Sequence, residues 1–309
     1  MKTRGENPLF NYIKGMIKMI DMTKWKKIAA ENVGKRNMAP GRLSGKISIV
    51  TGSAQGFGKG IAEILYAEGA SVVIADLNEE LAKTVAESLG ERAFAVKVDV
   101  SNEESVANMI GLTVERFGGL DLLVSNAGVL KAGSLSELEI RDFEFVTKIN
   151  YTAFFTCVKY AAPIMKAQFE ADNSWMGDII QINSKSGLSG SNKNFAYAGG
   201  KFGGIGLVQS FAMELAPVNI KVNAICPGNY YDGPLWSDPE RGLFVQYLNA
   251  GKVPGAKTVE DVKKFYLSKS LIQRGCLPED VTKAIMYAVE QTFETGQAIP
   301  VTGGQSMLH

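Results

Sequence analysis

The sequence predicts a single α/β domain whose core is a doubly wound parallel sheet with helices on both faces. From residue 46 onward, short apolar stretches of strand length alternate with stretches of helical periodicity. Strands that alternate with helices form right-handed βαβ units, and such units build a parallel sheet. A glycine-rich turn also follows the first strand and precedes the first helix, as is typical of doubly wound sheets. Strands are therefore expected at residues 47–50, 71–75, 93–98, 121–124, 178–182, 221–225 and 298–301.

Helices are expected between these strands, where apolar residues recur with helical spacing. Gly69 and Gly90 follow the first two helical stretches, and glycine is typical of the residue just after a helix. The expected helices cover residues 59–68, 79–89, 103–117, 141–168, 198–215 and 279–290.

Two parts of the chain fall outside this alternation. Residues 229–275 carry Gly, Pro and scattered charges over a length that indicates a functional lid rather than a simple connection. Residues 1–41 are expected to be an N-terminal extension of the domain formed by residues 42–309. The apolar pairs between Leu9 and Ile17 would line one face of a helix. We interpret the extension as frayed or as a helix packed on the body; the alternative is an arm that grips a second subunit.

The composition argues against several classes of protein. With 33 basic and 32 acidic residues, the chain lacks the basic stripe of a nucleic-acid-binding protein. Its single histidine is the terminal His309, which argues against Ser-His-Asp catalysis and histidine-based zinc sites. Cys157, Cys226 and Cys276 have neither metal-ligand nor disulfide-framework spacing. No apolar run reaches the roughly 18 residues of a membrane span, and no signal peptide is evident, so we expect a cytoplasmic location.

The glycine-rich turn has the features of a dinucleotide-binding site. Residues 51–58 read Thr-Gly-Ser-Ala-Gln-Gly-Phe-Gly. Glycines let the backbone approach a pyrophosphate, whose charge then faces the N-terminus of the following helix. The turn lacks the Gly-Lys-Ser/Thr ending of a P-loop, which argues against an ATP- or GTP-dependent enzyme. The residues expected to hold the cofactor here are Gly52, Ser53, Gln55, Gly56, Phe57 and Gly58.

Asp76 indicates which dinucleotide binds. It ends the second strand, where a carboxylate can accept hydrogen bonds from both hydroxyls of the adenosine ribose. The same carboxylate would repel the 2′-phosphate of NADP, and the following Leu77 offers no positive charge in compensation. NAD is therefore the expected cofactor. The alternative is that Asp76 is a surface residue that helps to cap the helix starting at Asn78.

Tyr197 and Lys201 are candidates for proton transfer. Their i, i+4 spacing places both side chains on one face of a helix. Tyrosine titrates near pH ~10, so a base at neutral pH needs a pKa about three units lower, which is roughly 4 kcal/mol. A lysine charge ~5 Å away contributes roughly 3 kcal/mol at an effective dielectric constant of ~20. The charge of an oxidised nicotinamide adds to this, so Lys201 is expected to lower the pKa of Tyr197.

Further polar residues occur close to where strands end. Ser184 follows the fifth strand, and Asn150 lies in the long helical stretch before that strand. Ligands bind at the carboxyl ends of the strands in open α/β sheets, so these residues are expected to share one site. The same edge is expected to include Asn126, Ala127, Gly128, Pro227 and Gly228.

Together these motifs resemble the short-chain dehydrogenase/reductase family, from about Arg42 to Gln305. The resemblance implies a Rossmann fold and an NAD-dependent oxidoreductase that moves a hydride between nicotinamide and a secondary alcohol or its ketone. It also implies a homotetramer, or a homodimer with the same interfaces, in which the helices of Asn150 and Tyr197 supply one contact face. No metal is implied.

The resemblance also assigns roles to single residues. It implies that Tyr197 is the catalytic acid and base, and that Lys201 lowers its pKa and holds the nicotinamide ribose. Ser184 would orient the substrate oxygen, and Asn150 would belong to a water relay to bulk solvent. Three further cofactor or structural positions are implied, namely the adenine-contacting Asp99 and Val100 and the strand-linking Asn126. One departure concerns the threonine that commonly follows Pro-Gly, because residues 229–233 contain neither Thr nor Ser.

Several stretches resemble family members that act on a sugar-alcohol phosphate. We therefore expect oxidation of such a compound at C2, or reduction of the ketose phosphate. Lys185 is expected to contact substrate hydroxyls or phosphate, unless it is merely solvated, and Asn183 and Asn229 are further polar candidates. The stretches are residues 180–187, 201–204, 274–276 and 301–305. Lid lysines that could gather a phosphate, or be solvated, are Lys252, Lys257, Lys263 and Lys264.

Two other functions remain open from the sequence. The divergent run at residues 229–231 allows a dehydrogenase of an unphosphorylated polyol, sugar or other hydroxy-metabolite. A non-catalytic NAD-binding sensor is the other alternative, but such a protein would not need the full set of four catalytic candidates.

Overall fold

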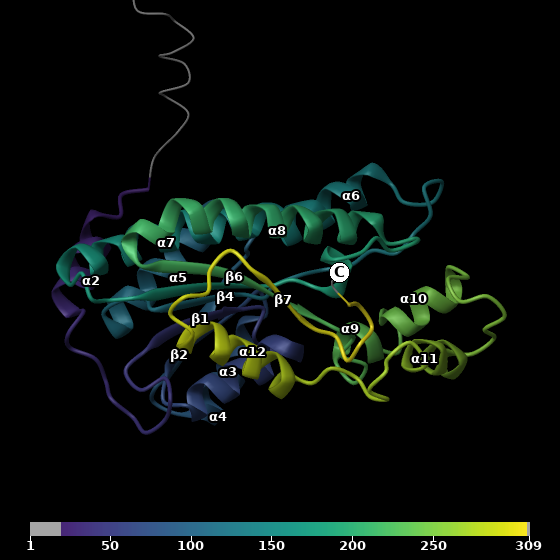
Figure 1. The fold of residues 1–309 in the computed structure, drawn as a ribbon, viewed down its shortest axis with the longest axis horizontal. Helices are drawn as coiled ribbons and strands as arrows, with labels where there is room; N and C mark the ends of the chain where they lie inside the picture. Colours follow the sequence, from purple (N-terminus) through teal and green to yellow (C-terminus); the bar gives the residue numbers. More distant parts are fainter. Residues whose placement is uncertain (1–19, 308–309) are drawn as a thin grey trace, which may run out of the picture.

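The computed structural model describes residues 20–307, which fold around one seven-stranded sheet (Figure 1). All neighbouring strands are parallel, in the order β3-β2-β1-β4-β5-β6-β7. The order reverses between β1 and β4, which defines the switch point of a doubly wound sheet. The predicted fold class is confirmed. The strands are β1 (Ile47–Thr51), β2 (Ser71–Asp76), β3 (Ala93–Lys97), β4 (Leu122–Ser125), β5 (Gly177–Ile182), β6 (Ile220–Pro227) and β7 (Ala298–Val301).

Helices cover both faces of the sheet, which is why its central strands are almost wholly buried. The helices on one face are α5 (Glu103–Phe117), α7 (Ala153–Ala171) and α8 (Phe195–Leu215), and those on the other are α3 (Gly56–Ala67), α4 (Glu79–Leu89) and α12 (Pro278–Glu290). Figure 1 shows α7 and α8 above the sheet and α3, α4 and α12 below it. Alternate residues of β1 serve the two cores, because Ile49 packs with the first set and Val50 with the second.

The expected helix at residues 141–168 is interrupted. It consists of α6 (Ile140–Thr147), one π-helical turn (Lys148–Thr152) and α7. The chain stays helical through such a turn, so the sequence pattern did not separate it from the helices on either side. Single π turns inside α-helices frequently mark functional sites, and this one contains Asn150.

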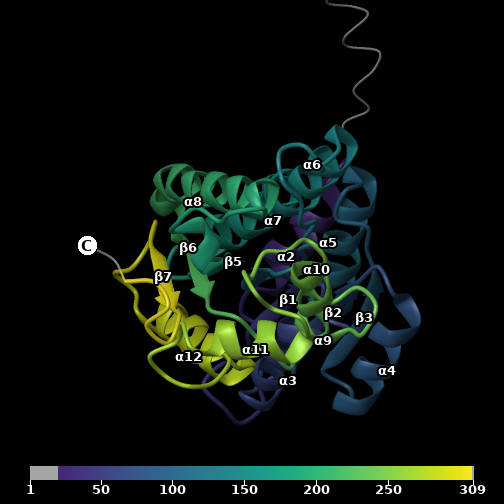
Figure 2. The same cartoon turned by 90° about the vertical axis from the view of Figure 1, so that its right-hand side faces the viewer.

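The segment at residues 229–275 contains three short helices, α9 (Pro234–Ser237), α10 (Leu243–Asn249) and α11 (Val259–Leu267). Figure 2 shows them grouped together at the end of the molecule that faces the viewer. Their core is aromatic. The ring of Trp236 lies 5.0–5.6 Å, between centroids, from the rings of Tyr231, Phe244, Tyr247 and Tyr266. The segment therefore has a small core of its own, which sequence periodicity did not indicate.

The described part of the N-terminal extension packs on the domain. Helix α2 (Thr23–Asn32) lies against α5 and α7 and buries Ala29 completely. The indole of Trp25 covers Gly111, where a Cβ atom would collide with the ring. Of the two interpretations of the extension, a helix packed on the body agrees with these residues. The apolar pairs between Leu9 and Ile17 lie outside the described residues.

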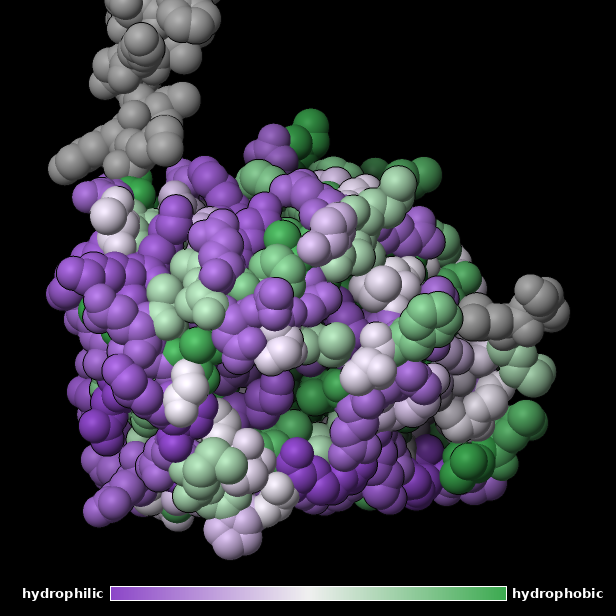
Figure 3. All heavy atoms as spheres, turned by 60° about the vertical axis from the view of Figure 1, so that its left-hand side comes forward, coloured by the Kyte–Doolittle hydropathy of each residue, from purple (hydrophilic) through white to green (hydrophobic). Residues whose placement is uncertain are grey.

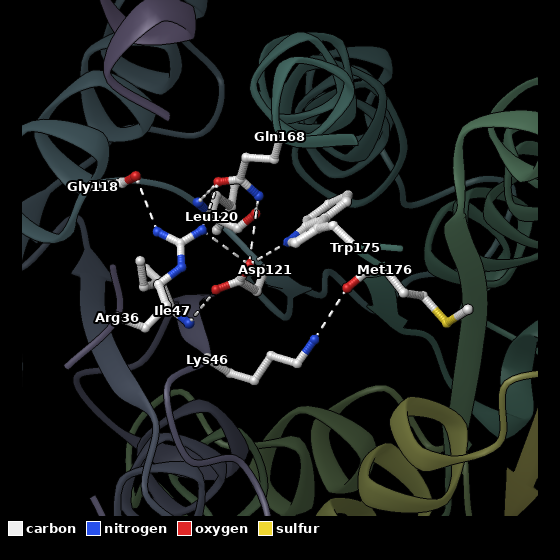
Figure 4. Close-up of polar contacts among 9 residues, drawn as sticks. All are labelled: Arg36, Lys46, Ile47, Gly118, Leu120, Asp121, Gln168, Trp175 and Met176. Carbon is white, nitrogen blue, oxygen red and sulfur yellow. Dashed lines mark hydrogen bonds and ion pairs between the residues drawn. The ribbon is translucent and has the colours of Figure 1, made fainter. Parts of the chain in front are cut away.

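A buried polar network joins the extension to the amino end of the sheet (Figure 4). Asp121, 2% exposed, precedes β4 and accepts hydrogen bonds from Ile47 N (2.8 Å) and Trp175 Nε1 (2.7 Å). The guanidinium of Arg36 lies 3.3 Å from Asp121 Oδ1 and donates to Gly118 O (3.0 Å) and Gln168 Oε1 (3.1 Å). Both charges are buried away from water, and each compensates the charge of the other.

Hydrophobic residues are interspersed with hydrophilic ones on the face shown in Figure 3. Within residues 20–307, no helix is both long and apolar enough to cross a membrane.

Candidate active site

The glycine-rich turn is wound tightly at the carboxyl end of β1. Gly52 and Gly56 have φ of 65° and 62°, a region that glycine adopts without strain. A Cβ atom on Gly58 would collide with the carbonyl of Gly52, so helix α3 can start this close to the turn only with glycine there. Ser53 fastens the turn, because its Oγ donates to Val50 O (2.6 Å) and accepts from Ala75 N (3.0 Å). This cradle, at a helix N-terminus and a switch point, fits a dinucleotide pyrophosphate.

Asn126 connects the turn to β4. Its Nδ2 donates to Thr51 O (2.9 Å) and Gly52 O (3.0 Å), and the backbone N–H groups of Asn126 and Ala127 donate to Thr51 Oγ1. The link between the two central strands that the family resemblance implies is therefore present in the geometry. The next residue, Gly128, is exposed at the same edge.

Asp76 lies at the carboxyl end of β2, half-buried beside the turn. Its Oδ2 accepts from Ala54 N (2.9 Å) and its Oδ1 from Asn78 N (3.0 Å). The carboxylate is thus oriented by the backbone on both sides, while Leu77 beside it is 65% exposed. The helix cap is made instead by Asn78, whose side chain accepts from Leu81 N. The remaining predicted adenine-side residues are Asp99, which accepts from Ser101 N, and the buried Val100.

Ser184, Tyr197 and Lys201 come together where β5 ends and α8 begins. Ser184 precedes a short 3-10 turn (Lys185–Gly187), and its Oγ accepts from Ser186 N (3.1 Å). Tyr197 lies in the first turn of α8, and Lys201 lies one turn further along. The Lys201 ammonium donates to Ile182 O (2.8 Å) and lies 5.5 Å from the centroid of the Tyr197 ring.

The pKa of Tyr197 differs from the sequence-based expectation. Burial raises the pKa of Tyr197 above its ordinary value, and the hydrogen-bonding Ser184 hydroxyl offsets this only in part. Burial also lowers the pKa of Lys201 to about 8, with the nearby Cys226 acting weakly in the opposite direction. The expectation treated the two charges in isolation and omitted the cost of burying a phenolate, which is the largest influence on the pKa of Tyr197.

Asn150 is fixed by the π turn. Its Oδ1 accepts from Val129 N (2.9 Å) and its Nδ2 donates to Val129 O (2.8 Å). A Cβ atom on Gly128 would lie 3.3 Å from Asn150 Oδ1 and 3.9 Å from Lys201 Nζ. Asn150, Gly128 and Lys201 therefore border one small space, although they are far apart in the sequence.

Two predicted substrate contacts are engaged elsewhere. Asn183 is buried and donates to Gln181 Oε1 (2.8 Å) and Lys201 O (2.9 Å), while its Oδ1 accepts from Ser184 N (2.9 Å). Asn183 therefore supports the loop that carries Ser184 from within, and its side chain is not directed at a substrate. Asn229 is also buried, and its Nδ2 donates to Tyr231 Oη (3.0 Å). A polar residue next to a motif can face either the substrate or the protein interior, and the sequence did not distinguish these two orientations.

The start of the lid contains residues that sequence reasoning did not assign. Tyr231 Oη donates to Tyr266 O (2.8 Å) and accepts from Gln305 Nε2 (3.1 Å), in addition to its bond with Asn229. Tyr230 packs on Phe57 of the glycine-rich turn, with ring centroids 4.8 Å apart. In place of the usual threonine, this run carries aromatic residues that attach the lid to the glycine-rich turn and to the segment after β7. The only sequence feature that could have indicated these contacts is the pair of adjacent tyrosines.

The remaining predicted cofactor residues, Pro227 and Gly228, end β6 at the same edge, where Gly228 N donates to Val301 O (2.9 Å). Among residues 20–307, no group of three or more His, Cys, Asp or Glu side chains is placed to hold a metal ion.

The fold and this arrangement define a class of protein. Residues 46–236 match the short chain dehydrogenase family, and the chain belongs to that family. Its members are oxidoreductases that use nicotinamide cofactors and act on alcohol or keto groups.

Particular relatives extend the match over most of the chain. Sorbitol-6-phosphate 2-dehydrogenase of Escherichia coli (strain K12) is 35% identical over 270 residues, which cover 85% of this chain and 99% of the relative. Trans-4-hydroxycyclohexanecarboxylate dehydrogenase of Sinomonas cyclohexanicum is 32% identical over 276 residues, with 86% and 94% covered. The crystal structure of sorbitol-6-phosphate 2-dehydrogenase from Erwinia amylovora has a TM-score of 0.77 at 35% identity, covering 84% of this chain and 100% of that one.

Proposed function

We propose that this chain is an NAD-dependent dehydrogenase that interconverts a sugar-alcohol phosphate, such as sorbitol 6-phosphate, with its 2-ketose phosphate. The observation that carries the proposal is the position of Lys185, a half-buried cation directly after Ser184. A cation there suits an anionic substrate. A relative that is 35% identical over nearly its whole length is named for the same substrate, which supports the proposal.

The choice of NAD rests on Asp76. Its carboxylate is held at the carboxyl end of β2 by two backbone N–H groups, and Leu77 offers no cation for a 2′-phosphate. A fixed negative charge at this place favours ribose hydroxyls over a ribose phosphate.

The chain supplies the proton chemistry. When bound, the nicotinamide cofactor takes or gives the hydride at the reacting carbon. The Ser184 hydroxyl would hydrogen-bond the reacting oxygen, and the Tyr197 phenol would donate or remove its proton. Because burial raises the pKa of Tyr197, the phenol holds its proton at neutral pH and can protonate the oxygen of a ketone under reduction.

In the oxidation direction Tyr197 must accept a proton and pass it on. The ammonium of Lys201, 5.5 Å from the ring centroid, favours the phenolate by roughly 3 kcal/mol at an effective dielectric constant of ~20. Lys201 also borders the space next to Asn150 and Gly128. We therefore assign the exit of the proton to Lys201 and a water relay near Asn150.

A second candidate substrate is an unphosphorylated hydroxy compound. The relative of 32% identity is named for a hydroxycyclohexanecarboxylate, which favours this alternative. The test follows NADH absorbance at 340 nm while NAD is offered with sorbitol 6-phosphate, mannitol 1-phosphate, free sorbitol and trans-4-hydroxycyclohexanecarboxylate. A preference for sorbitol 6-phosphate is expected. A higher kcat/KM for either unphosphorylated compound would refute the proposed substrate while leaving the reaction class intact.

We also propose that the chain assembles as a homotetramer, or as a homodimer with the same contacts. Large apolar side chains remain exposed along the helices that carry Asn150 and Tyr197. A shared face would cover them. These side chains are Phe143, Phe145, Phe155, Phe202 and Met213. The mass measured by light scattering tests this, since a monomer at micromolar concentration would contradict it.

A further inference from the structure

Three lysines from separate segments lie close enough for their charges to repel one another. Lys185 follows Ser184, Lys252 follows α10, and Lys269 follows α11. The Lys193 ammonium donates to Ala250 O (2.5 Å), which fastens the turn before Lys252 to the segment that follows Ser184. The lid thus brings two lysines towards the loop that carries the third.

The ammonium groups of the two lid lysines border one aromatic surface. Lys252 Nζ lies 4.1 Å from the centroid of the Tyr247 ring and 3.3 Å from Ser191 Oγ. Lys269 Nζ lies 4.1 Å from the centroid of the Phe265 ring and 5.5 Å from that of the Tyr266 ring. The centroids of the Tyr247 and Tyr266 rings are 5.5 Å apart. Cation–π contacts of this kind orient a lysine without neutralising it.

The three lysines carry uncompensated charge. Among residues 20–307, none of them forms an ion pair with a carboxylate. Burial, and then repulsion by Lys269, lower the pKa of Lys185 to about 8. Burial, and then repulsion by Lys185 and Lys269, lower the pKa of Lys252 to about 8. A bound anion would relieve this repulsion.

We propose that Lys185, Lys252 and Lys269, together with Ser191, form the subsite for the phosphate ester of the substrate. This inference rests on the proposed function and names the residues that bind the phosphate. A phosphate monoester is close to a dianion at neutral pH and presents three strong acceptor oxygens. Three ammonium groups and one hydroxyl supply the positive charge and the hydrogen-bond donors that such a group requires.

The position of the subsite suits a phosphate at the far end of a substrate chain. Tyr197 packs against the aromatic cluster that contains Tyr247 and Tyr266. The lysine-bearing surface therefore begins next to the phenol that acts on the reacting oxygen. The lid supplies two of the three cations, so it would bind the phosphate, while the catalytic residues come from the end of β5 and from α8.

The other lid lysines provide matched controls. Lys257 and Lys264 are exposed, and neither influences the pKa of Lys185 or Lys252. Lys257→Met removes the same charge from the same segment as Lys252→Met. Equal midpoints of thermal unfolding would establish that the variants are folded.

The first experiment compares kcat/KM for sorbitol 6-phosphate and for free sorbitol in the wild type and in Lys252→Met, Lys269→Met and Lys257→Met. Loss of one charged hydrogen bond corresponds to roughly 10–100-fold. We expect that loss for the phosphate ester in the first two variants, mainly in KM, and less than about twofold change for sorbitol. Lys269→Arg should retain most of the activity. Equal losses for both substrates, or a loss in Lys257→Met of the same size, would overturn the subsite.

A second experiment separates failure of the subsite from failure of the proposed substrate. Inorganic phosphate is titrated into the full chain and its binding is followed by ³¹P NMR, without turnover. The cofactor turn can also hold phosphate, so the informative quantity is the difference between wild type and variants. Weaker binding in Lys252→Met and Lys269→Met, in a chain inactive on sugar phosphates, would keep the subsite and refute the substrate. Identical binding in wild type and both variants would refute the subsite itself.

Discussion

The buried pair Arg36–Asp121 provides a direct test of how the extension contributes to stability. In Arg36→Met the guanidinium is lost from a position where its side chain is 10% exposed and that of Asp121 is 3% exposed. Breaking a buried ion pair by removing one partner costs about 3–5 kcal/mol. Here Asp121 keeps hydrogen bonds from Ile47 N and Trp175 Nε1, so its charge is not left without partners. The carbonyl of Gly118 does lose its hydrogen bond from the guanidinium.

We therefore expect Arg36→Met to lower the free energy of unfolding by about 3 kcal/mol, at the lower end of that range. Urea denaturation at fixed protein concentration measures it, with the exposed neighbour Lys35→Met as the control. The network lies at the amino end of the sheet, opposite the active site, so kcat should not change. In Arg36→Met/Asp121→Asn the two losses should be clearly less than additive. A loss below about 1 kcal/mol in Arg36→Met, or strict additivity, would refute this reasoning.

Four further outcomes are expected. Asp76→Ala should weaken NAD at least tenfold more than NADP in kcat/KM, and equal losses would remove Asp76 from cofactor selection. Tyr197→Phe should abolish turnover while NADH binding, followed by fluorescence, persists; retained turnover would exclude the phenol from the chemistry. Gly58→Ala should abolish cofactor binding, because a Cβ there collides with a backbone carbonyl, and normal NADH affinity would contradict that geometry. Burial lowers the pKa of Lys201 to about 8, so the charged lysine lowers the free energy of unfolding below about pH 8, and this effect is lost as the pH rises above the pKa of the unfolded chain. Lys201→Met should therefore be more stable than wild type at pH 7, by a margin that shrinks as the pH rises from about 8 to above 10. An advantage that grows with pH in urea denaturation would contradict the sign.

The local pattern of apolar residues was sufficient to predict the strands of the sheet. All seven strands lie within about two residues of the predicted ranges, because strands buried on both faces are rich in apolar residues. Chain order then determined the parallel direction, since each strand is followed by a helix long enough for a crossover. The catalytic candidates were predictable for a related reason, because residues at the carboxyl ends of parallel strands share one edge.

Side-chain direction was not predictable. Asn183 and Lys185 flank Ser184, yet the first turns inward to Gln181 and the backbone of α8, and the second joins the lysines of the lid. From the sequence, Lys252, Lys257, Lys263 and Lys264 were equivalent, and Lys269 was not singled out. Only the packing of α10 and α11 around Trp236 places Lys252 3.3 Å from Ser191 Oγ and close enough to Lys185 and Lys269 for their charges to repel.

What the sequence by itself determined was the sheet, the glycine-rich turn and the common edge on which the candidate proton-transferring residues lie, because each depends on local periodicity or on position relative to a strand. The tertiary structure alone decided the raised pKa of Tyr197, the place of Arg36 against Asp121 and the meeting of the three lysines. These properties depend on burial and on contacts between segments distant in the chain, and neither quantity is contained in a local pattern.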